Sequence, residues 1–316
     1  MGISDRFKNS SQKNTRFIFL FSYFCKHIIS KPVFMKKLII YAWAILCSVN
    51  LFSQDEKALQ YKLISSSDLV GITTLDLLDP YLSPLMYTGS GVKYEHAERK
   101  FFSAQETNLS MEGKISALAG ITINPAYTSS MTYLGVNYSW GMHYHFRILP
   151  ELQILAGGTA DAGFGYKSIA RNVNNPVNLD LAVNLNLSGI ARYDIPTRRR
   201  VLRLSCELEI PVFGYMFVPQ GGASYYEMFE LGSLSNAFHF SSLHNKLGLS
   251  GNLMLDIPFK HSTWRFGVNT GKLKYKANNM VFKHNEYSLM IGCKYDLYIF
   301  AGKKNRAPEN FISTDK

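Results

Sequence analysis

The segment Leu134–Arg147 alternates without a break between apolar residues and polar or small ones. Successive side chains of an extended strand point to opposite faces, so this segment would present one apolar face and one polar face. A strand of a globular protein is usually ~5–6 residues long, much shorter than this alternation. The segment therefore predicts a long strand that separates an apolar environment from a polar one.

The same two-residue period recurs from about residue 68 to residue 300. A tilted strand that crosses a bilayer needs ~9–11 residues, and the repeated segments are at least that long. Long alternating segments separated by turns are the signature of a transmembrane barrel. The sequence thus predicts an all-β, antiparallel up-and-down barrel with ten strands at 68–78, 90–102, 108–123, 131–147, 152–167, 180–195, 201–213, 246–258, 263–273 and 286–300.

The joints between these strands alternate in predicted length. Transmembrane barrels have short periplasmic turns and longer external loops, so the alternation places both termini in the periplasm. A barrel of twelve strands is the alternative, if 213–219 and 235–242 form one more hairpin. The short joints are 103–107, 148–151, 196–200 and 259–262, and the longer joints are 79–89, 124–130, 168–179, 214–245 and 274–285.

A signal peptide precedes the predicted barrel. Lys36 and Lys37 follow Met35, and an apolar run then extends to small and polar residues at Ser53 and Gln54. This layout predicts export through a Sec-type pathway, with the outer membrane of a Gram-negative envelope as the destination. The predicted parts are an over-called upstream start (1–34), the signal peptide (35–54), a periplasmic segment (55–67), the barrel (68–300) and a periplasmic tail (301–316).

The net charge of +11 is concentrated in the leader. Residues 1–54 hold eight Lys or Arg and one acid, Asp5, which leaves 26 basic and 22 acidic residues in the remainder. A nucleic-acid partner is excluded because it needs a basic face on the folded part. Cys206 and Cys293 fall on the apolar faces of separate strands, which does not indicate a disulfide framework.

Several loop phrases carry a family resemblance. They are "YLSPLMYTGSG" at Tyr81–Gly91, "ARNVNNP" at Ala170–Pro176, "GASYYEMFELG" at Gly222–Gly232 and "LMIGCKYDL" at Leu289–Leu297. With these phrases the chain resembles an uncharacterised domain-of-unknown-function family of Gram-negative (Bacteroides-type) cell-envelope proteins. The resemblance implies secretion and an outer-membrane-barrel-like fold, and it implies no activity.

The polar faces of the strands supply candidate residues for the lumen. His143 and His145 share a face and could bind a metal with Asp161, but two His at i and i+2 are a weak signal, and no metal site is expected. Glu207 and Glu209 could act as an acid–base pair, although neutralisation by basic side chains across the lumen is favoured. The expected polar lumen residues are His143, His145, Asp161, Asp180, Arg192, Arg203, Glu207, Glu209 and Lys294.

Two loops supply the remaining candidates. The long loop 214–245 contains weak catalytic candidates, but the chain has no nucleophile motif of a known hydrolase class. The Asn-rich loop after 170 favours turns and could also bind a sugar or a phosphate. The catalytic candidates are Ser224, Glu227 and His239, and the binding candidates are Arg171, Asn172, Asn174, Asn175, Tyr225 and Tyr226.

These features predict a small outer-membrane barrel whose lumen is filled by polar side chains and whose loops bind or shield something outside. Three alternatives stay open: a narrow porin-like pore, a barrel hydrolase that uses loop 214–245, and a secreted soluble lipocalin-like barrel. The balance favours a protein that is not an enzyme and has no cofactor. The expected partners are outer-membrane lipid and, during biogenesis, the barrel assembly machinery.

Overall fold

The computed structural model describes most of the predicted barrel and little of the two ends of the chain. The predicted upstream start, the signal peptide and nearly all of the tail lie outside the described residues, and the segment 55–67 is described in part. The described residues are 61–62, 64–103, 108–170, 175–198, 200–230, 236–259, 262–297 and 311–312.

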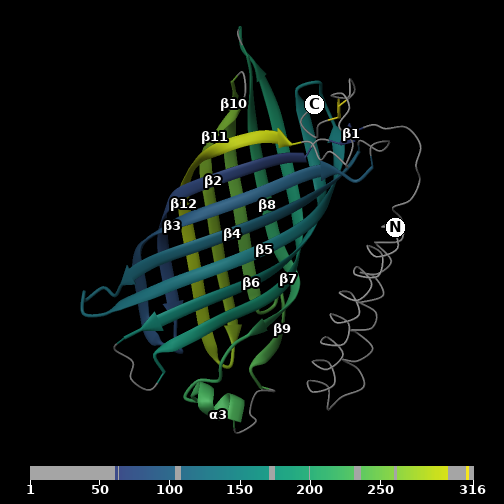
Figure 1. Ribbon diagram of the computed structural model, residues 1–316. Helices are drawn as coiled ribbons and strands as arrows, with labels where there is room; N and C mark the ends of the chain where they lie inside the picture. The colour runs from purple at the N-terminus through teal and green to yellow at the C-terminus, as the bar shows by residue number, and fades with distance from the viewer. Residues whose placement is uncertain are drawn as a thin grey trace, which may run out of the picture. The chain divides into compact units, whose positions relative to one another are not determined.

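Ten long antiparallel strands close into a barrel (Figure 1). Each strand pairs with the next along the chain, and the pairing of β12 with β2 completes the ring. The predicted ten-stranded antiparallel barrel is confirmed. The strands of the ring are β2 (Ile64–Asp79), β3 (Ser83–Phe101), β4 (Leu109–Ile123), β5 (Ser130–Arg147), β6 (Leu152–Ile169), β7 (Val177–Pro196), β8 (Val201–Phe217), β10 (Lys246–Pro258), β11 (Thr263–Ala277) and β12 (Met280–Leu297).

Four short elements lie outside the ring. Strand β9 (Phe238–Ser242) pairs with β8, and β1 (Tyr61–Lys62) pairs in parallel with β13 (Phe311–Ile312). Helix α3 (Tyr225–Glu230) lies at one end of the barrel, below the strands in Figure 1. We call this end the α3 end, and the opposite end, where β2 begins and β12 ends, the terminal end. No helix among the described residues is both long enough and apolar enough to cross a bilayer.

The predicted long joints at 79–89 and 274–285 are wrong. Residues 80–82 alone separate β2 from β3, and Asn278 and Asn279 alone separate β11 from β12. Both Asn residues have positive φ, 49° and 59°, which suits a tight hairpin turn. The strands therefore continue well beyond the predicted bounds at the α3 end.

The predicted strands are too short there because the polarity of their two faces reverses at the α3 end. Apolar side chains point into the barrel and form a buried cluster, so the simple rule of polar residues inside fails. The rings of Tyr275 and Phe282 stack with centroids 4.8 Å apart. This cluster explains why residues 68–78 alternate poorly in the sequence, since Leu75 and Leu77 belong to it.

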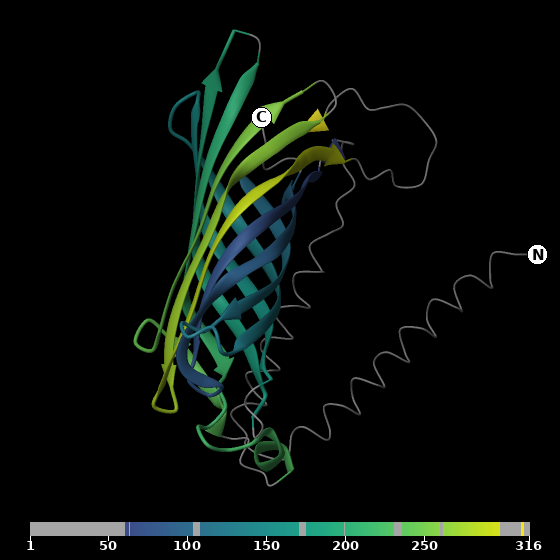
Figure 2. The ribbon, with the colours of Figure 1, turned by 90° about the vertical axis from the view of Figure 1, so that its left-hand side faces the viewer.

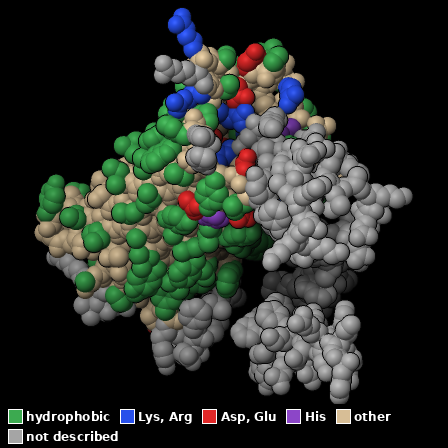
Figure 3. All heavy atoms as spheres, turned by 45° about the horizontal axis from the view of Figure 1, so that its top comes forward, with side chains coloured by type: hydrophobic (Ala, Val, Ile, Leu, Met, Phe, Trp, Pro, Cys, Tyr) green, Lys and Arg blue, Asp and Glu red, His purple; other side chains and the backbone are tan. Residues whose placement is uncertain are grey.

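The outer surface of the barrel is apolar over most of its height. Ile72, Leu187 and Leu289 are each more than 60% exposed, and hydrophobic side chains cover the flank seen in Figure 3. Their neighbours in sequence point inward, and many of these are buried and polar, as Thr73 and Ser288 are. This orientation is the reverse of a lipocalin-like container, which would hold its apolar faces inside.

The apolar surface ends in a polar cluster near the terminal end. Asp68 points outward and accepts hydrogen bonds from Tyr94 Oη at 2.7 Å and Tyr295 Oη at 2.6 Å, and His96 Nδ1 lies 2.8 Å away. Tyrosines with an apolar ring and a bonded hydroxyl are typical of the border between a membrane and water. The cluster thus marks one rim of the apolar surface on β2, β3 and β12.

Strand β8 divides between two partners. Its first part pairs with β10 from Arg203↔Asp256 to Glu209↔Ser250, and its last part, from Phe213, pairs with β9. Pro211 lies at the division, where it cannot donate to a ladder. A Cβ on Gly248 would lie 2.7 Å from the Pro211 ring, so this close approach requires glycine.

The alternative of twelve strands is wrong for the ring. Residues 213–217 and 238–242 do form a hairpin, but they extend β8 beyond its contact with β10 and add no strand to the ring. The side view in Figure 2 shows the barrel wall from another direction.

The apolar outer surface predicts that a charged side chain placed on it will destabilise the protein in a bilayer. Leu187 lies near the middle of β7 and points outward. Leu187→Arg is expected to lower the free energy of unfolding in lipid vesicles by about 2–4 kcal/mol, because an arginine near the bilayer midplane is poorly solvated. Urea titration of the vesicle-inserted protein measures it, with Leu187→Ala as control. Equal midpoints for the Arg and Ala variants would contradict a lipid-facing position.

Candidate functional site

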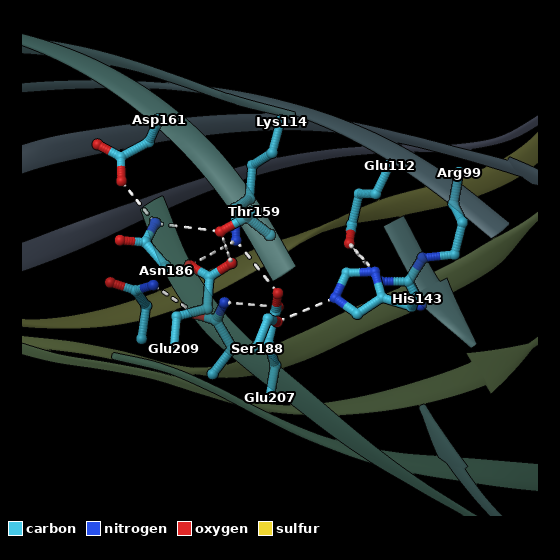
Figure 4. Close-up of polar contacts among 12 residues, drawn as sticks. Arg99, Glu112, Lys114, His143, Thr159, Asp161, Asn186, Ser188, Glu207 and Glu209 are labelled. Atoms are coloured by element: carbon cyan, nitrogen blue, oxygen red, sulfur yellow. Dashed lines mark hydrogen bonds and ion pairs between the residues drawn. The ribbon is translucent and has the colours of Figure 1, made fainter. Parts of the chain in front are cut away.

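An ionic layer crosses the middle of the lumen. Lys114 of β4 lies 3.3 Å from Glu207 and 3.5 Å from Glu209, both on β8 (Figure 4). Strands β4 and β8 are not neighbours in the sheet, so these ion pairs span the inside of the barrel. Thr159 also donates to Glu209 at 3.4 Å, and Asn252 donates to Glu207 at 3.0 Å.

A second group continues this layer towards the terminal end. Arg99 pairs with Glu112 at 2.5 Å, and His143 is fully buried beside them (Figure 4). His143 Nε2 lies 2.9 Å from Ser188 Oγ, and its Nδ1 lies 3.9 Å from Glu112. The imidazole therefore joins β5 to β7 and lies between two polar groups.

Two arginines form ion pairs inside the barrel near the terminal end. Arg203 forms two parallel hydrogen bonds with Asp194, at 2.5 and 2.7 Å, and Arg265 forms two with Asp256, at 2.6 and 2.7 Å. Paired bonds of this kind fix geometry as well as charge. Lys294 lies 3.7 Å from Asp256 and adds a further positive charge. A small cavity of about 70 Å³ remains among these groups.

A larger cavity of about 300 Å³ lies on the α3 side of the ionic layer. Glu95, Lys114 and Asn252 line both cavities, so the layer separates them. Side-chain amides, hydroxyl groups and glycines line much of the larger cavity, together with two tyrosines. Its lining includes Asn137, Asn184, Asn186, Asn252, Asn269, Ser250, Gly163, Tyr133 and Tyr275.

The loop between β8 and β9 covers the α3 end. We call its described residues, 218–230 and 236–237, the capping loop. Asn278 Nδ2 donates to the carbonyl oxygens of Val218, at 3.0 Å, and Asn236, at 3.3 Å. Tyr81 donates to the Ala223 carbonyl at 2.9 Å. The capping loop is therefore tied to the β2–β3 turn and to the β11–β12 turn.

Tyr225 connects the capping loop to β7. Its hydroxyl accepts from Leu179 N at 2.7 Å and donates to Asn178 Oδ1 at 2.9 Å. Burial raises the pKa of Tyr225, and burial together with Asp79 and Glu227 raises the pKa of Tyr81 to about 12. Both phenols thus keep their protons at neutral pH and can donate these bonds.

A buried ion group lies beneath this contact. Lys167 lies 3.1 Å from Asp79 and 2.6 Å from Asp180, and Asn178 donates to Asp79 at 2.7 Å. The group joins the end of β2 to β6 and β7, so the ring of strands is fixed at the α3 end by charge as well as by apolar contact.

The predicted catalytic candidates do not come together. Ser224 and Glu227 form a capping box for α3: Ser224 N donates to Glu227 Oε2 at 2.7 Å, and Glu227 N donates to Ser224 Oγ at 3.2 Å. His239 lies on β9, and its Nε2 is buried without a hydrogen-bond partner among the described residues. Ser224 is thus engaged with the helix start, and within the described residues no hydrogen bond joins it to His239.

The predicted binding candidates are placed in part. Arg171, Asn172, Asn174 and the side chain of Tyr226 lie outside the described residues. Asn175 lies between β6 and β7, and Tyr225 is half-buried in the contact with Asn178.

All nine predicted lumen residues point into the barrel. His145 bonds Ser110 and Gln153, whereas Asp161 accepts from Asn184 and Asn186, so His143, His145 and Asp161 do not converge. No cluster of three or more His, Cys, Asp or Glu among the described residues could hold a metal ion. The nine are His143, His145, Asp161, Asp180, Arg192, Arg203, Glu207, Glu209 and Lys294.

Sequence reasoning missed several central residues. Lys114 and Glu112 lie on the polar face of their strand, so the alternation could have identified them as lumen residues. The same holds for Lys246 at the start of the strand 246–258. Arg99 lies in a segment whose alternation is poor, which leaves little signal.

Residues 37–304 match the family described as "Protein of unknown function (DUF3316)". The chain belongs to this family. It is an outer-membrane-like β-barrel with polar and charged side chains buried inside. The Bacteroides-type lineage stays a prediction. The search of curated proteins found no match.

Three solved structures illustrate the similarity of this DUF3316 member to other barrels. The transport unit of the autotransporter AIDA-I from Escherichia coli is 12% identical, with 81% of this chain and 97% of that chain covered and a TM-score of 0.39. The outer membrane protease OmpT from Escherichia coli is 8% identical, with coverages of 78% and 99% and a TM-score of 0.41. Ail of Yersinia pestis is 10% identical, with coverages of 75% and 100% and a TM-score of 0.28.

The ionic layer generates a prediction about stability. Lys114→Met leaves Glu207 and Glu209 buried without their shared cation, and we expect the free energy of unfolding to fall by about 3–5 kcal/mol. Urea titration in detergent measures this change. Lys100→Met, at an exposed position of β3, is the control and should change little. Adding Glu207→Gln and Glu209→Gln should restore much of the loss, and equal midpoints for both single Lys variants would show that the layer contributes nothing.

Proposed function

We propose that the chain is an integral outer-membrane barrel that is closed to bulk solutes and capped by its own loop. One observation carries the proposal: apolar side chains cover the outside of the ring while charged side chains are paired inside it. A soluble monomer rarely exposes a contiguous apolar surface larger than a few hundred Å². Hydrocarbon outside the barrel gives this surface a suitable solvent.

The lumen favours a filled barrel over an open pore. A ten-stranded barrel is little wider than the eight-stranded kind, whose interior side chains can fill. Here the ion pairs of Lys114 cross the lumen, and the apolar cluster and the capping loop lie further along the same axis. Each barrier opposes the passage of hydrated solutes, so the narrow pore is the weaker proposal.

The capping loop supports a role at the outer surface. If the terminal end faces the periplasm, the capping loop faces outward, where it shields the lumen. Its serine and glutamate serve the start of α3, which gives the hydrolase alternative no support. Outer-membrane lipid as the surrounding partner, export through a signal peptide and insertion by the barrel assembly machinery are part of this proposal.

Cell fractionation tests the location. The full chain, expressed with its own leader in a Gram-negative host, is expected in the outer-membrane fraction and should resist carbonate extraction, because its apolar surface stays in lipid. Leu187→Arg is a matched variant that should reduce the inserted fraction. Recovery of the wild-type protein in the soluble periplasmic fraction would reject the location.

Conductance across planar bilayers tests closure. The wild-type protein is expected to give no steady channels, because the ionic layer and the capping loop both block the lumen. Replacing residues 221–236 with a short Gly-Ser linker should leave conductance low. Combining this change with Lys114→Ser, Glu207→Ser and Glu209→Ser should raise the conductance to the level that the remaining apolar cluster allows. Wild-type channels as large as those of the combined variant would contradict a closed barrel.

A further inference from the structure

The larger cavity contains a buried lysine without a carboxylate partner. Lys246, the first residue of β10, is 3% exposed and lines the cavity. Among the described residues its one hydrogen bond goes to Asn184 Oδ1, at 2.6 Å, and no carboxylate oxygen lies within 4.0 Å of its ammonium group. An ammonium group has three donors, so this lysine retains donor capacity beside the cavity.

The other buried lysines of the barrel are matched by acids. Lys93 lies 2.6 Å from Glu286, Lys114 lies between Glu207 and Glu209, and Lys167 lies between Asp79 and Asp180. A buried cation without an opposite charge is costly. Lys246 therefore differs from its neighbours in a way that an anion in the cavity would correct.

A second donor lies close to Lys246. Ser241 of β9 is 1% exposed, and its hydroxyl has no hydrogen-bond partner among the described residues. A Cβ placed on Gly214 would lie 3.0 Å from Ser241 Oγ and 2.7 Å from Asn184 Oδ1. The atoms around Gly214 are therefore tightly packed, and they include both the serine hydroxyl and the amide oxygen that Lys246 bonds.

Five acids line the cavity, and Asp161, the one that shares Asn184 with Lys246, is already satisfied. Asp161 accepts from Asn184 at 2.9 Å and from Asn186 at 2.5 Å. Its oxygens are therefore occupied by amide donors, whereas Lys246 has donors to spare. A ligand that complements this corner must bring acceptor oxygens.

The remainder of the wall fits hydroxyl groups. Asn137, Asn252 and Asn269 line the cavity with side-chain amides, which donate and accept, and Ser250 is exposed within it. The volume of about 300 Å³ is at the lower end of ligand pockets, which run from about 300 to 1,000 Å³. The size thus suits one small hydrophilic molecule.

We propose that this cavity binds a small anionic polyol, a sugar acid or a sugar phosphate, with its anionic oxygen against Lys246 Nζ. The amide side chains of the lining bind the hydroxyl groups. This binding goes beyond the proposed function. It rests on the closed barrel that we propose, but it does not depend on which membrane holds the barrel.

Calorimetric titration of the full chain in detergent tests the proposal with four probes: D-glucuronate, D-glucose 6-phosphate, D-glucose and acetate. At least one anionic sugar is expected to bind at least about ten-fold more tightly than glucose or acetate, since a charged hydrogen bond contributes on the order of ten-fold or more. Glucuronate and the phosphate ester distinguish the two kinds of anion. No binding of either, or equal binding of glucose, would overturn the proposal.

Variants locate the binding in the cavity. Lys246→Met should weaken the anionic sugar at least about ten-fold and leave glucose unchanged, whereas Lys274→Met, at an exposed position on β11, should change neither. Lys246→Arg keeps the charge if the Met variant fails to fold, and it should retain the preference for the anion. Ser250→Phe fills the cavity and should abolish binding while the barrel remains folded. Unchanged affinity in Ser250→Phe or Lys246→Met would overturn the site.

Discussion

The pairing of β12 with β2 is the constraint on which the remainder of the structure depends. In hydrocarbon an unpaired backbone group costs several kcal/mol, so a sheet is tolerated there when no open edge remains. Closure also gives every strand an inside and an outside. The apolar exterior, the ionic layer and the cavity all follow from that division, because each strand must send alternate side chains to opposite environments.

The number and centres of the strands could be predicted from the sequence because the two-residue period is a local property. The predicted strand 131–147 matches β5, Ser130–Arg147, almost to the residue. The joints were wrong where inward residues are apolar, as at Leu75 and Phe282, since polar outward neighbours such as Asp76 reverse the pattern there. The hairpin of β8 with β9 was visible as an alternative, but its place outside the ring depends on Pro211 and on the register of β10.

The sequence predicted which side chains of the candidate site point into the lumen, but it did not predict which of them form ion pairs. The alternation along β8 placed Glu207 and Arg203 inside the barrel. The lysine that pairs with Glu207, however, comes from β4. Which side chains meet across the lumen depends on the register of all the strands in the ring. The capping box was readable as serine followed three residues later by glutamate, a pattern that indicates a helix start as readily as a reactive hydroxyl. The sequence around Lys246 gives no sign that it lacks a direct ion pair, because the distance from its ammonium group to each carboxylate is set by the fold.

The ion pairs that span the lumen also affect how the barrel assembles. Lys114 reaches the β8 carboxylates when five consecutive strands, from β4 to β8, have curled far enough to face one another. A sheet that is still open would present these charges to lipid or to water without their mates. Ion pairs between neighbouring strands, such as Arg203 with Asp194, need no closed ring, whereas the pairs of Lys114 form late. The pairs that span the lumen therefore favour the closed barrel over partly assembled intermediates.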